Sequence, residues 1–299
     1  MGCGSGTSGP RSAGDSVPST TPPRGVQAPD ECVAAVEAAR ETIEGTPVWA
    51  RFCPGRHGYT APAEVPSDAL VTHLDLLAGM TESPRTDSNT GRGCAATFGR
   101  TYRIQIGFAD GEVAQVSGRT DPECASRITG NDGTLVHGPE DLGVYGAAMS
   151  AFGRQYADGF AAAGPGPALA CPADPRDPDN VDLDGASASL DTGYHLGERS
   201  PMLMPLTAVR GIVCTWLRGS AKPVVRDLTA EQAERVRVGL HAIYGAMVDC
   251  AESPDKPTIS AVVEDKTGTR RAVTIVESEC STVIRSDQGF GLGFAWLDR

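Results

Sequence analysis

The chain has 299 residues, a formal net charge of −12 and a hydrophobic content of 40%. This apolar content is enough to bury a core, and the length favours two domains. The acidic balance argues against a nucleic-acid-binding protein, because contact with phosphates needs clustered Lys and Arg. No apolar run approaches the length of a membrane-spanning helix.

The first segment in chain order, residues 1–29, consists almost entirely of Gly, Ser, Thr, Pro and small polar residues. Such a composition buries too little apolar surface to fold, so we expect a disordered tether. Cys3 stands directly before this tether, and the arrangement resembles the mature end of a bacterial lipoprotein. The resemblance implies that Cys3 is the lipidation site, whereas the alternative is a plain tail with an incidental cysteine.

Residues 30–165 are predicted to form a first structured repeat. A strand is expected over 48–53, followed by a short helix that begins at Ser67 and uses Leu70, Leu74 and Leu77 on its apolar side. Alternating apolar residues on both sides of Asp110-Gly111 predict a hairpin, because Asp-Gly is a favoured hairpin turn. A helix over 143–163 then carries an apolar stripe, formed by Tyr145, Met149, Phe152, Tyr156 and Phe160.

Residues 166–299 are predicted to form a second repeat, which begins within the Gly/Pro run 164–167 because neither a helix nor a central strand tolerates it. A long Asp- and Pro-rich loop leads to a strand over 209–216. Thr229 and Gln232 then form a capping-box pattern at the start of an amphipathic helix. Apolar runs on both sides of Thr267-Gly268 predict a second hairpin.

The nine cysteines indicate disulfides rather than a metal site. None forms a C-x-x-C pair, whereas structural zinc sites usually take two ligands from one short knuckle. Cys94 and Cys124 have the same spacing as Cys250 and Cys280, and each pair flanks one of the predicted hairpins. We therefore expect Cys94–Cys124 and Cys250–Cys280 disulfides.

The remaining cysteines of the folded region leave Cys32 to pair with Cys53 and Cys171 to pair with Cys214. Connectivity does not follow from spacing alone, so these two pairs are hypotheses. Four disulfides place the folded region in an oxidising, extracytoplasmic compartment. The expected fold class is α+β, with two tandem related repeats, each a small disulfide-stabilised antiparallel sheet covered by a helix.

Several features of the second repeat resemble uncharacterised exported proteins and lipoproteins of high-GC Gram-positive bacteria. They are the Cys171-Pro172 opening, the Met204-Pro205 segment before the strand 213–216, the helix, and the cysteine-flanked hairpin. The resemblance covers most of the second repeat and, more loosely, the first. It implies export but no activity and no catalytic residues.

One acidic pattern fits part of a calcium-binding loop. Oxygen-bearing side chains and Gly185 occupy five positions of the template, the candidate ligands being Asn180, Asp182, Asp184 and Asp191. The usual last glutamate, the apolar anchor and a preceding helix are missing. We therefore expect a solvated acidic loop without a cofactor, and calcium binding is the alternative.

No common catalytic motif is present. The sequence contains neither a G-x-S-x-G elbow nor a His-Glu-x-x-His pair, and its folded cysteines are assigned to disulfides. His57 lies between Arg56 and Gly58 in a predicted loop and is the histidine that most resembles a site residue. These features favour a secreted, lipid-anchored, non-enzymatic module that binds an unknown protein or envelope ligand and contacts the membrane only through its anchor. The alternatives are an extracytoplasmic hydrolase with an unrecognised carboxylate site and a calcium-dependent binding module.

Overall fold

The computed structural model describes residues 27–33, 43–53, 66, 68–78, 80–84, 101–119, 126–128, 134–137, 143–164, 166–173, 204, 206–217, 219–241, 257–277, 282–286 and 289–292. The strands are β1 Pro47–Phe52, β2 Thr81–Pro84, β3 Thr101–Phe108, β4 Val113–Arg119, β5 Ser126–Ile128, β6 Thr134–His137, β7 Ala208–Trp216, β8 Val224–Leu228, β9 Thr258–Asp265, β10 Arg270–Glu277, β11 Thr282–Ser286 and β12 Gly289–Leu292. The described helices are α1 Asp75–Ala78, α2 Gly143–Asp158 and α4 Ala230–His241.

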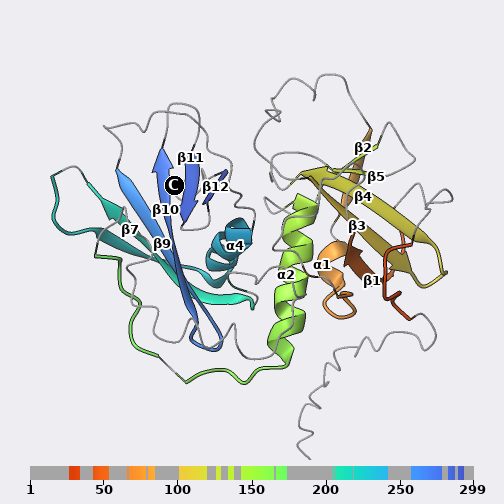
Figure 1. The fold of residues 1–299 in the computed structure, drawn as a ribbon, viewed down its shortest axis with the longest axis horizontal. Helices are drawn as coiled ribbons and strands as arrows, with labels where there is room; N and C mark the ends of the chain where they lie inside the picture. The colour runs from red at the N-terminus through yellow and green to blue at the C-terminus, as the bar shows by residue number, and fades with distance from the viewer. Residues whose placement is uncertain are drawn as a thin grey trace, which may run out of the picture.

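The strands form two antiparallel sheets, so the α+β class is confirmed (Figure 1). Sheet A has the order β1-β3-β4-β5-β6-β2, and sheet B has the order β12-β11-β10-β9-β7-β8. Five strands follow one another in chain order in each sheet, β1, β3, β4, β5, β6 in sheet A and β7, β9, β10, β11, β12 in sheet B. The sixth strand is added at opposite ends of this five-strand run, next to β6 in sheet A and next to β7 in sheet B.

One face of sheet A, called its inner face here, packs against α2. The predicted apolar stripe is buried in the same core as Ile104, Ile106 and Phe108 of β3, except for Phe160, which lies beyond the end of α2 and is partly buried. Because side chains alternate along a strand, the three β3 residues all point to the helix side. The predicted strand 48–53, the first hairpin and the helix at 143 are thereby confirmed. The helix is shorter than the predicted range of 143–163.

The inner face of sheet B packs against α4 in the same way. Val213 of β7 and Ala261 and Val263 of β9 share a core with Ala233 and Val236 of α4. The helix starts as predicted: the Gln232 backbone N–H donates to Thr229 Oγ1 (3.1 Å), and the Thr229 N–H donates to Gln232 Oε1 (3.0 Å). This reciprocal pair satisfies two of the free N–H groups at the helix start.

The helix predicted from Ser67 is wrong. Leu70 instead exchanges both backbone hydrogen bonds with Ala50 of β1, at 2.9 and 2.8 Å, and His73 has a left-handed φ of 55° that a helix does not allow. Only the four-residue α1 remains helical. The apolar spacing was genuine, because Leu70 and Leu77 are both buried, but non-local pairing with Ala50 overrides it.

The two sheets also share two local irregularities. Each first strand has a register shift, between Pro47 and Trp49 in β1 and between Ala208 and Arg210 in β7. Each central hairpin closes through the same two backbone hydrogen bonds and a glycine with positive φ, Gly111 at 88° and Gly268 at 90°. These features align the sheets residue by residue, so that Trp49 corresponds to Arg210 and Phe108 corresponds to Asp265.

Candidate functional site

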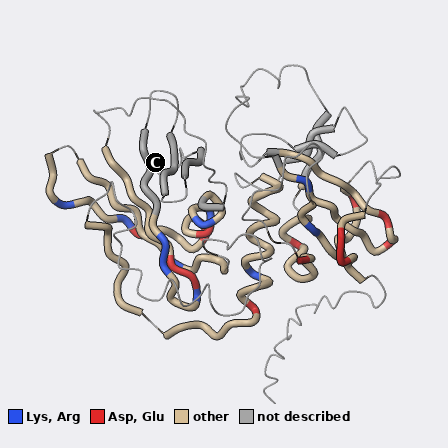
Figure 2. The backbone as a smooth tube through the Cα atoms, in the orientation of Figure 1, with Lys and Arg blue, Asp and Glu red and all other residues tan. Residues whose placement is uncertain are grey.

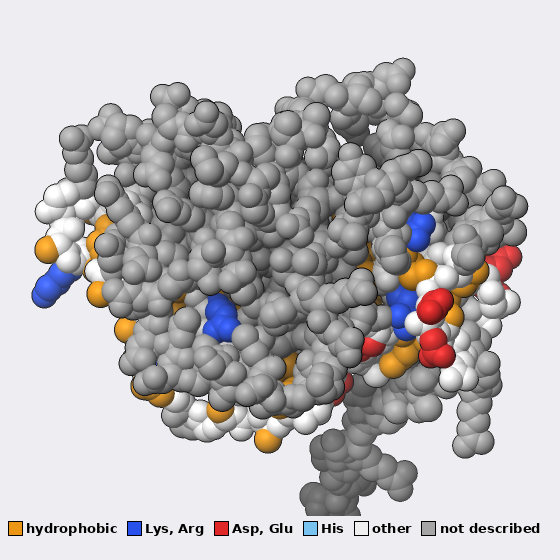
Figure 3. Space-filling view, viewed as in Figure 1, with side chains coloured by type: hydrophobic (Ala, Val, Ile, Leu, Met, Phe, Trp, Pro, Cys, Tyr) orange, Lys and Arg blue, Asp and Glu red, His pale blue; other side chains and the backbone are white. Residues whose placement is uncertain are grey.

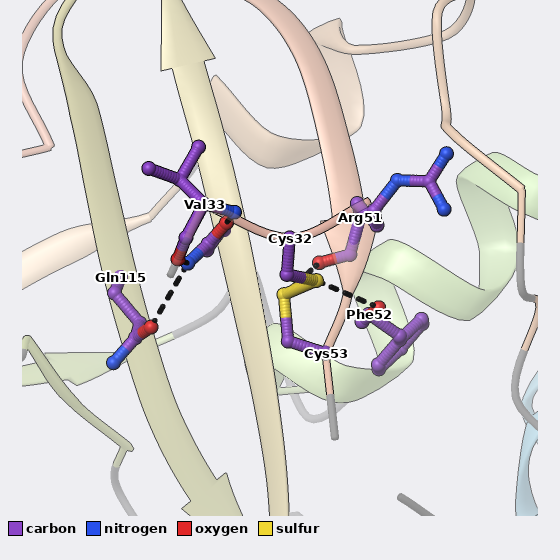
Figure 4. Close-up of a disulfide and its surroundings, with 7 residues drawn as sticks. Cys32, Val33, Arg51, Phe52, Cys53 and Gln115 are labelled. Carbon is purple, nitrogen blue, oxygen red and sulfur yellow. Dashed lines mark hydrogen bonds between the residues drawn. A yellow bond between two sulfur atoms is a disulfide. The ribbon is translucent and has the colours of Figure 1, made fainter. Parts of the chain in front are cut away.

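An irregular segment, residues 27–33, crosses the outer face of sheet A, and we call it strap A. Cys32 of strap A forms a disulfide with Cys53 directly after β1, with an S–S distance of 2.03 Å (Figure 4). Beside the disulfide, the Val33 N–H donates to Gln105 Oε1 (2.8 Å), and Gln105 Nε2 donates to the Val33 carbonyl (3.0 Å). The amide of Gln105 therefore binds the backbone of strap A as a neighbouring strand would.

A second irregular segment, residues 166–173, covers the outer face of sheet B, and we call it strap B. Cys171 forms a disulfide with Cys214 of β7, with an S–S distance of 2.04 Å. Leu169 packs on the apolar row made by Ile212, Val262 and Ala272. A row here is a set of outer-face side chains that are neighbours across the strands of a sheet. Every second residue of strap B lies over the next row, as in an extended chain.

Pro167 of strap B is held by two arginines. Its carbonyl accepts a hydrogen bond from Arg210 (3.0 Å) and another from Arg270 (2.9 Å). Both arginines also donate to Glu264, through Nε at 2.6 Å in each case. Figure 2 shows that basic and acidic positions adjoin one another near the β9–β10 turn of sheet B. We call Arg210, Glu264 and Arg270 the clamp.

The clamp fixes the charge of Glu264. Desolvation by burial raises the pKa of its carboxyl, but the hydrogen bonds and charges of Arg210 and Arg270 outweigh this and hold the pKa below its ordinary value. Glu264 is therefore ionised at neutral pH and binds both guanidinium groups. Its stabilising contribution is present above the ordinary carboxyl pKa and is lost as the pH falls through the lowered one.

Asp265, the next residue along β9, is a buried carboxylate of a different kind. Its side chain points to the inner face, and its Oδ1 accepts hydrogen bonds from the Thr267 N–H (2.8 Å), the Thr267 hydroxyl (2.6 Å) and the Thr269 N–H (3.1 Å). Within the described part of the chain, Oδ2 is buried and has no hydrogen-bond partner. Desolvation by burial raises the pKa of this carboxyl, which is 1% exposed.

Glu264 and Asp265 do not form a catalytic pair. Adjacent residues of a strand point to opposite faces of the sheet, so the two carboxylates have no substrate in common. The observed role of Glu264 is to hold strap B, and that of Asp265 is to order the β9–β10 turn.

A buried ion pair joins the two halves of the molecule between α2 and α4. Arg237 is 0% exposed and donates to both carboxylate oxygens of Glu234, at 2.7 Å each. The same guanidinium donates to the carbonyls of Met149 in α2 (2.8 Å) and Met204 (3.0 Å). A Cβ on Gly153 of α2 would lie 2.7 Å from Arg237 Nη2, so only glycine permits this approach.

His73 belongs to a polar contact between the segment 68–73 and α2. Its Nε2 lies 2.8 Å from Asp158 Oδ2, and both side chains are partly exposed. Gln155 accepts from the backbone N–H groups of Val71 and Thr72, and the Tyr156 hydroxyl donates to Asp68. These bonds dock the segment that replaces the expected helix.

Sheet B also exposes apolar side chains at its free edge. In the edge strand β8, Val224 is 59% exposed and Val225 is 53% exposed. Leu217, directly after the neighbouring strand β7, is exposed as well, and the exposed Val209 lies at the other end of β7. Figure 3 shows hydrophobic side chains at the corresponding left margin of the molecule, beside a basic group. We call Leu217, Val224 and Val225, which lie at the same end of the β7–β8 pair, the edge patch.

Many residues singled out from the sequence lie outside the described residues. They are Cys3, His57, Cys94, Cys124, Asn180, Asp182, Asp184, Gly185, Asp191, Cys250 and Cys280. The lipidation site, the two hairpin disulfides and the acidic loop therefore remain sequence-based predictions. In the described ranges, no three side chains of the His, Cys, Asp or Glu types gather as metal ligands, and no helix is long and apolar enough to span a membrane.

The sequence indicated the cysteines of both straps but not the polar groups that hold the straps. Gln105, Glu264 and Arg237 lie within strands or a helix, and each contacts a segment far away along the chain. A charged or amide residue at an otherwise apolar position was the only local signal. Comparison of the chain with known protein families, with characterised proteins and with solved structures finds no match.

Proposed function

We propose that this chain is an exported, non-enzymatic binding module, anchored by lipid at Cys3 and built from two related units, 30–165 and 166–299. The observation that carries the proposal is that each outer face is closed by an irregular strap tied through a disulfide. Neither segment is a strand of its sheet, so the disulfides contribute much of what holds the straps, and disulfides persist in oxidising compartments.

The common register of the sheets supports the relation between the units. Cys53 donates its backbone N–H to Arg103 beside β1, and Cys214 pairs with Ser260 in β7, so both cysteines stand at the same step after the register shift. The shared five-strand run and the matching hairpins point the same way. Gene duplication is the simplest source of such agreement.

The edge patch supports binding rather than catalysis. Exposed apolar side chains on an edge strand are typical of interaction surfaces, because such a strand offers backbone groups to a partner. The buried carboxylates, in contrast, are engaged with arginines or with a turn. The calcium-dependent alternative concerns residues 180–191, which lie outside the described residues, so it stays a prediction.

The compartment is tested by producing the full chain in an oxidising periplasm and in a reducing cytosol. We expect a folded, monodisperse protein only from the periplasm. An equally stable protein with free thiols from the cytosol would contradict export as the reason for the cysteines.

The binding surface is tested by photo-crosslinking from position 225 in the native envelope, with Val224→Lys as the disrupting variant. We expect one discrete adduct that Val224→Lys abolishes and that the distant exposed variant Glu231→Gln retains. An adduct that survives Val224→Lys, or no adduct at all, would count against the edge patch.

A further inference from the structure

Strap B has two ties of different chemistry at separate points. The clamp holds the carbonyl of Pro167, and the disulfide holds Cys171 four residues later. Just upstream of strap B, the Ala163 N–H donates to the Lys266 carbonyl (2.6 Å), which fixes the approach of the chain. The end near Pro167 is therefore secured without the disulfide, and the end near Cys171 depends on it.

The contact beneath strap B is small. The buried part of the outer-face cluster comprises Ile212, Cys214, Val262 and Ala272, and Leu169 is only partly buried against it. Besides Leu169, strap B contributes the partly buried Cys171 and the buried Pro172, which adjoins the disulfide. Apolar burial stabilises by about 25 cal/mol per Å², so a contact of this size contributes little against the entropy of an extended segment. The disulfide is thus the main restraint on residues 169–173.

Strap A is tied differently. The two hydrogen bonds from Gln105 fall on Val33, the residue next to Cys32. Loss of the Cys32–Cys53 bond would leave strap A held at the adjacent residue, whereas loss of the Cys171–Cys214 bond would free residues 168–173, the part of strap B beyond the clamp.

We propose that strap B is a cover hinged at the clamp and latched by the Cys171–Cys214 disulfide, and that Cys171 Sγ is the site at which an external dithiol opens it. Cys214 is fully buried in β7, and Cys171 is partly exposed, so an incoming sulfur reaches Cys171 first.

The exchange proceeds in two balanced steps. One thiolate of the dithiol bonds to Cys171 Sγ, and the Sγ–Sγ bond breaks with its electron pair leaving on Cys214, which takes up a proton. The second thiolate then attacks the first sulfur of the dithiol and releases Cys171, which is protonated. Two electrons and two protons pass from the dithiol to the cysteine pair, and the dithiol becomes a disulfide.

Opening at the latch uncovers the apolar row of Ile212, Val262 and Ala272. Because the clamp still holds Pro167, Cys171 stays near Cys214, and the reverse exchange with the disulfide form of the dithiol re-forms the Cys171–Cys214 bond and returns the dithiol. The result is a reversible, redox-dependent exposure of the outer face of sheet B, independent of the edge patch.

Matched single-cysteine variants test the cover. Cys171→Ser leaves a thiol at Cys214, and Cys32→Ser leaves one at Cys53, which is equally buried. In native buffer we expect iodoacetamide to alkylate Cys214 at least about tenfold faster than Cys53, read at each peptide by mass spectrometry. Equal rates, or rates for Cys214 that rise with denaturant as global unfolding does, would overturn the proposal.

A second measurement uses the unmodified chain, so that misfolding of a variant does not decide the outcome. Thermolysin cleaves before Leu169, and dithiothreitol should accelerate this cut while α2 and the sheet B strands stay intact. Glu264→Gln, which removes the hinge charge, should accelerate the cut further in reduced protein, whereas the exposed control Glu231→Gln should not. An unchanged cut at Leu169 after reduction, or degradation of the whole chain at the same rate, would contradict a hinged cover.

Discussion

Sheets A and B close their outer faces with different chemistry at the same register positions. Trp49 lies over Gly107 in sheet A, where sheet B has Arg210 beside Glu264. One row further, sheet A has the amides of Gln105 and Gln115, which are replaced by Val262 and Ala272 in sheet B. The polar and apolar rows are therefore interchanged: the row nearer the hairpin is apolar in sheet A and charged in sheet B, and the next row is polar in sheet A and apolar in sheet B.

The straps also run in opposite directions. Strap A passes the cysteine row first and the Gln105 row next, whereas strap B passes the clamp, then the apolar row, then Cys214. The common plan therefore includes the strands, the hairpin and the strand-side cysteine, but not the strap. A disulfide to the first strand is the one solution that both sheets share.

The inner faces differ in chemical character at the start of the central hairpin. Phe108 fills the core of sheet A at the start of its hairpin, and the corresponding residue of sheet B is Asp265. A carboxylate in place of a core ring loses apolar burial and leaves Oδ2 without a partner in the described part of the chain. Sheet B gains an ordered turn from it, through Thr267 and Thr269.

The largest expected effect comes from breaking the junction between the halves. Glu234→Gln leaves the fully buried Arg237 without its counter-charge, and such a loss costs about 3–5 kcal/mol. Urea unfolding of the full chain measures it. The control Glu231→Gln removes the charge of an exposed carboxylate that pairs at i,i+4 with the largely buried Arg235, and it should change stability by no more than about 0.5 kcal/mol. Equal losses of unfolding free energy in the two variants would show that the Glu234–Arg237 ion pair does not stabilise the junction between the halves.

Removing each disulfide compares the straps directly. The bonded cysteines are 43 residues apart in the sequence for strap B and 21 apart for strap A. The chain-entropy relation therefore gives losses of unfolding free energy of about 4 kcal/mol for Cys171→Ser/Cys214→Ser and about 3 kcal/mol for Cys32→Ser/Cys53→Ser. Denaturant unfolding of the two double variants is the measurement. A loss below about 1 kcal/mol in either variant would remove that strap from the account.

Gly153 tests how closely α2 approaches α4 and the residue before β7. Gly153→Ala adds helix propensity of up to about 1 kcal/mol, yet its Cβ meets Arg237 and Thr207 Oγ1 at 2.7 and 2.9 Å. We expect a net loss of about 1–3 kcal/mol in thermal or urea unfolding. Gly164→Ala is the control, since nothing lies within 4 Å of its added carbon. A stabilised Gly153→Ala variant would contradict the close approach.

Asp265 gives a smaller, pH-dependent difference between the sheets. Its pKa is raised in the folded state, so its ionisation destabilises the protein as the pH rises through that value. Asp265→Asn keeps the Oδ1 acceptor, and we expect it to stabilise by about 1 kcal/mol at pH 7.5, with less gain at pH 4.5. The exposed turn residue Asp110, changed to Asn, should show no such trend. A gain that is independent of pH would contradict this assignment.

Local signals in the sequence predicted the elements well. The Thr229–Gln232 capping box, the Asp110-Gly111 turn and the α2 stripe depend on residues within a few positions of one another, and all are confirmed. Leu70 shows the limit, because its apolar spacing fits a helix and only distant Ala50 makes it a bridge.

The polar groups of the candidate site were not predictable for the same reason. Gln105 contacts Val33, and Arg237 contacts Met149, across long stretches of chain. A single sequence carries no record of such contacts, whereas widely spaced cysteines have few roles, so their pairing was open to inference.

Peptide mapping of the non-reduced full chain by mass spectrometry tests the central claim most directly, namely that each sheet is latched to its own strap. We expect Cys32 linked to Cys53 and Cys171 linked to Cys214, with no cross-link between the halves among these four. Free thiols at these positions, or a bond joining Cys53 to Cys214 or Cys32 to Cys171, would contradict it.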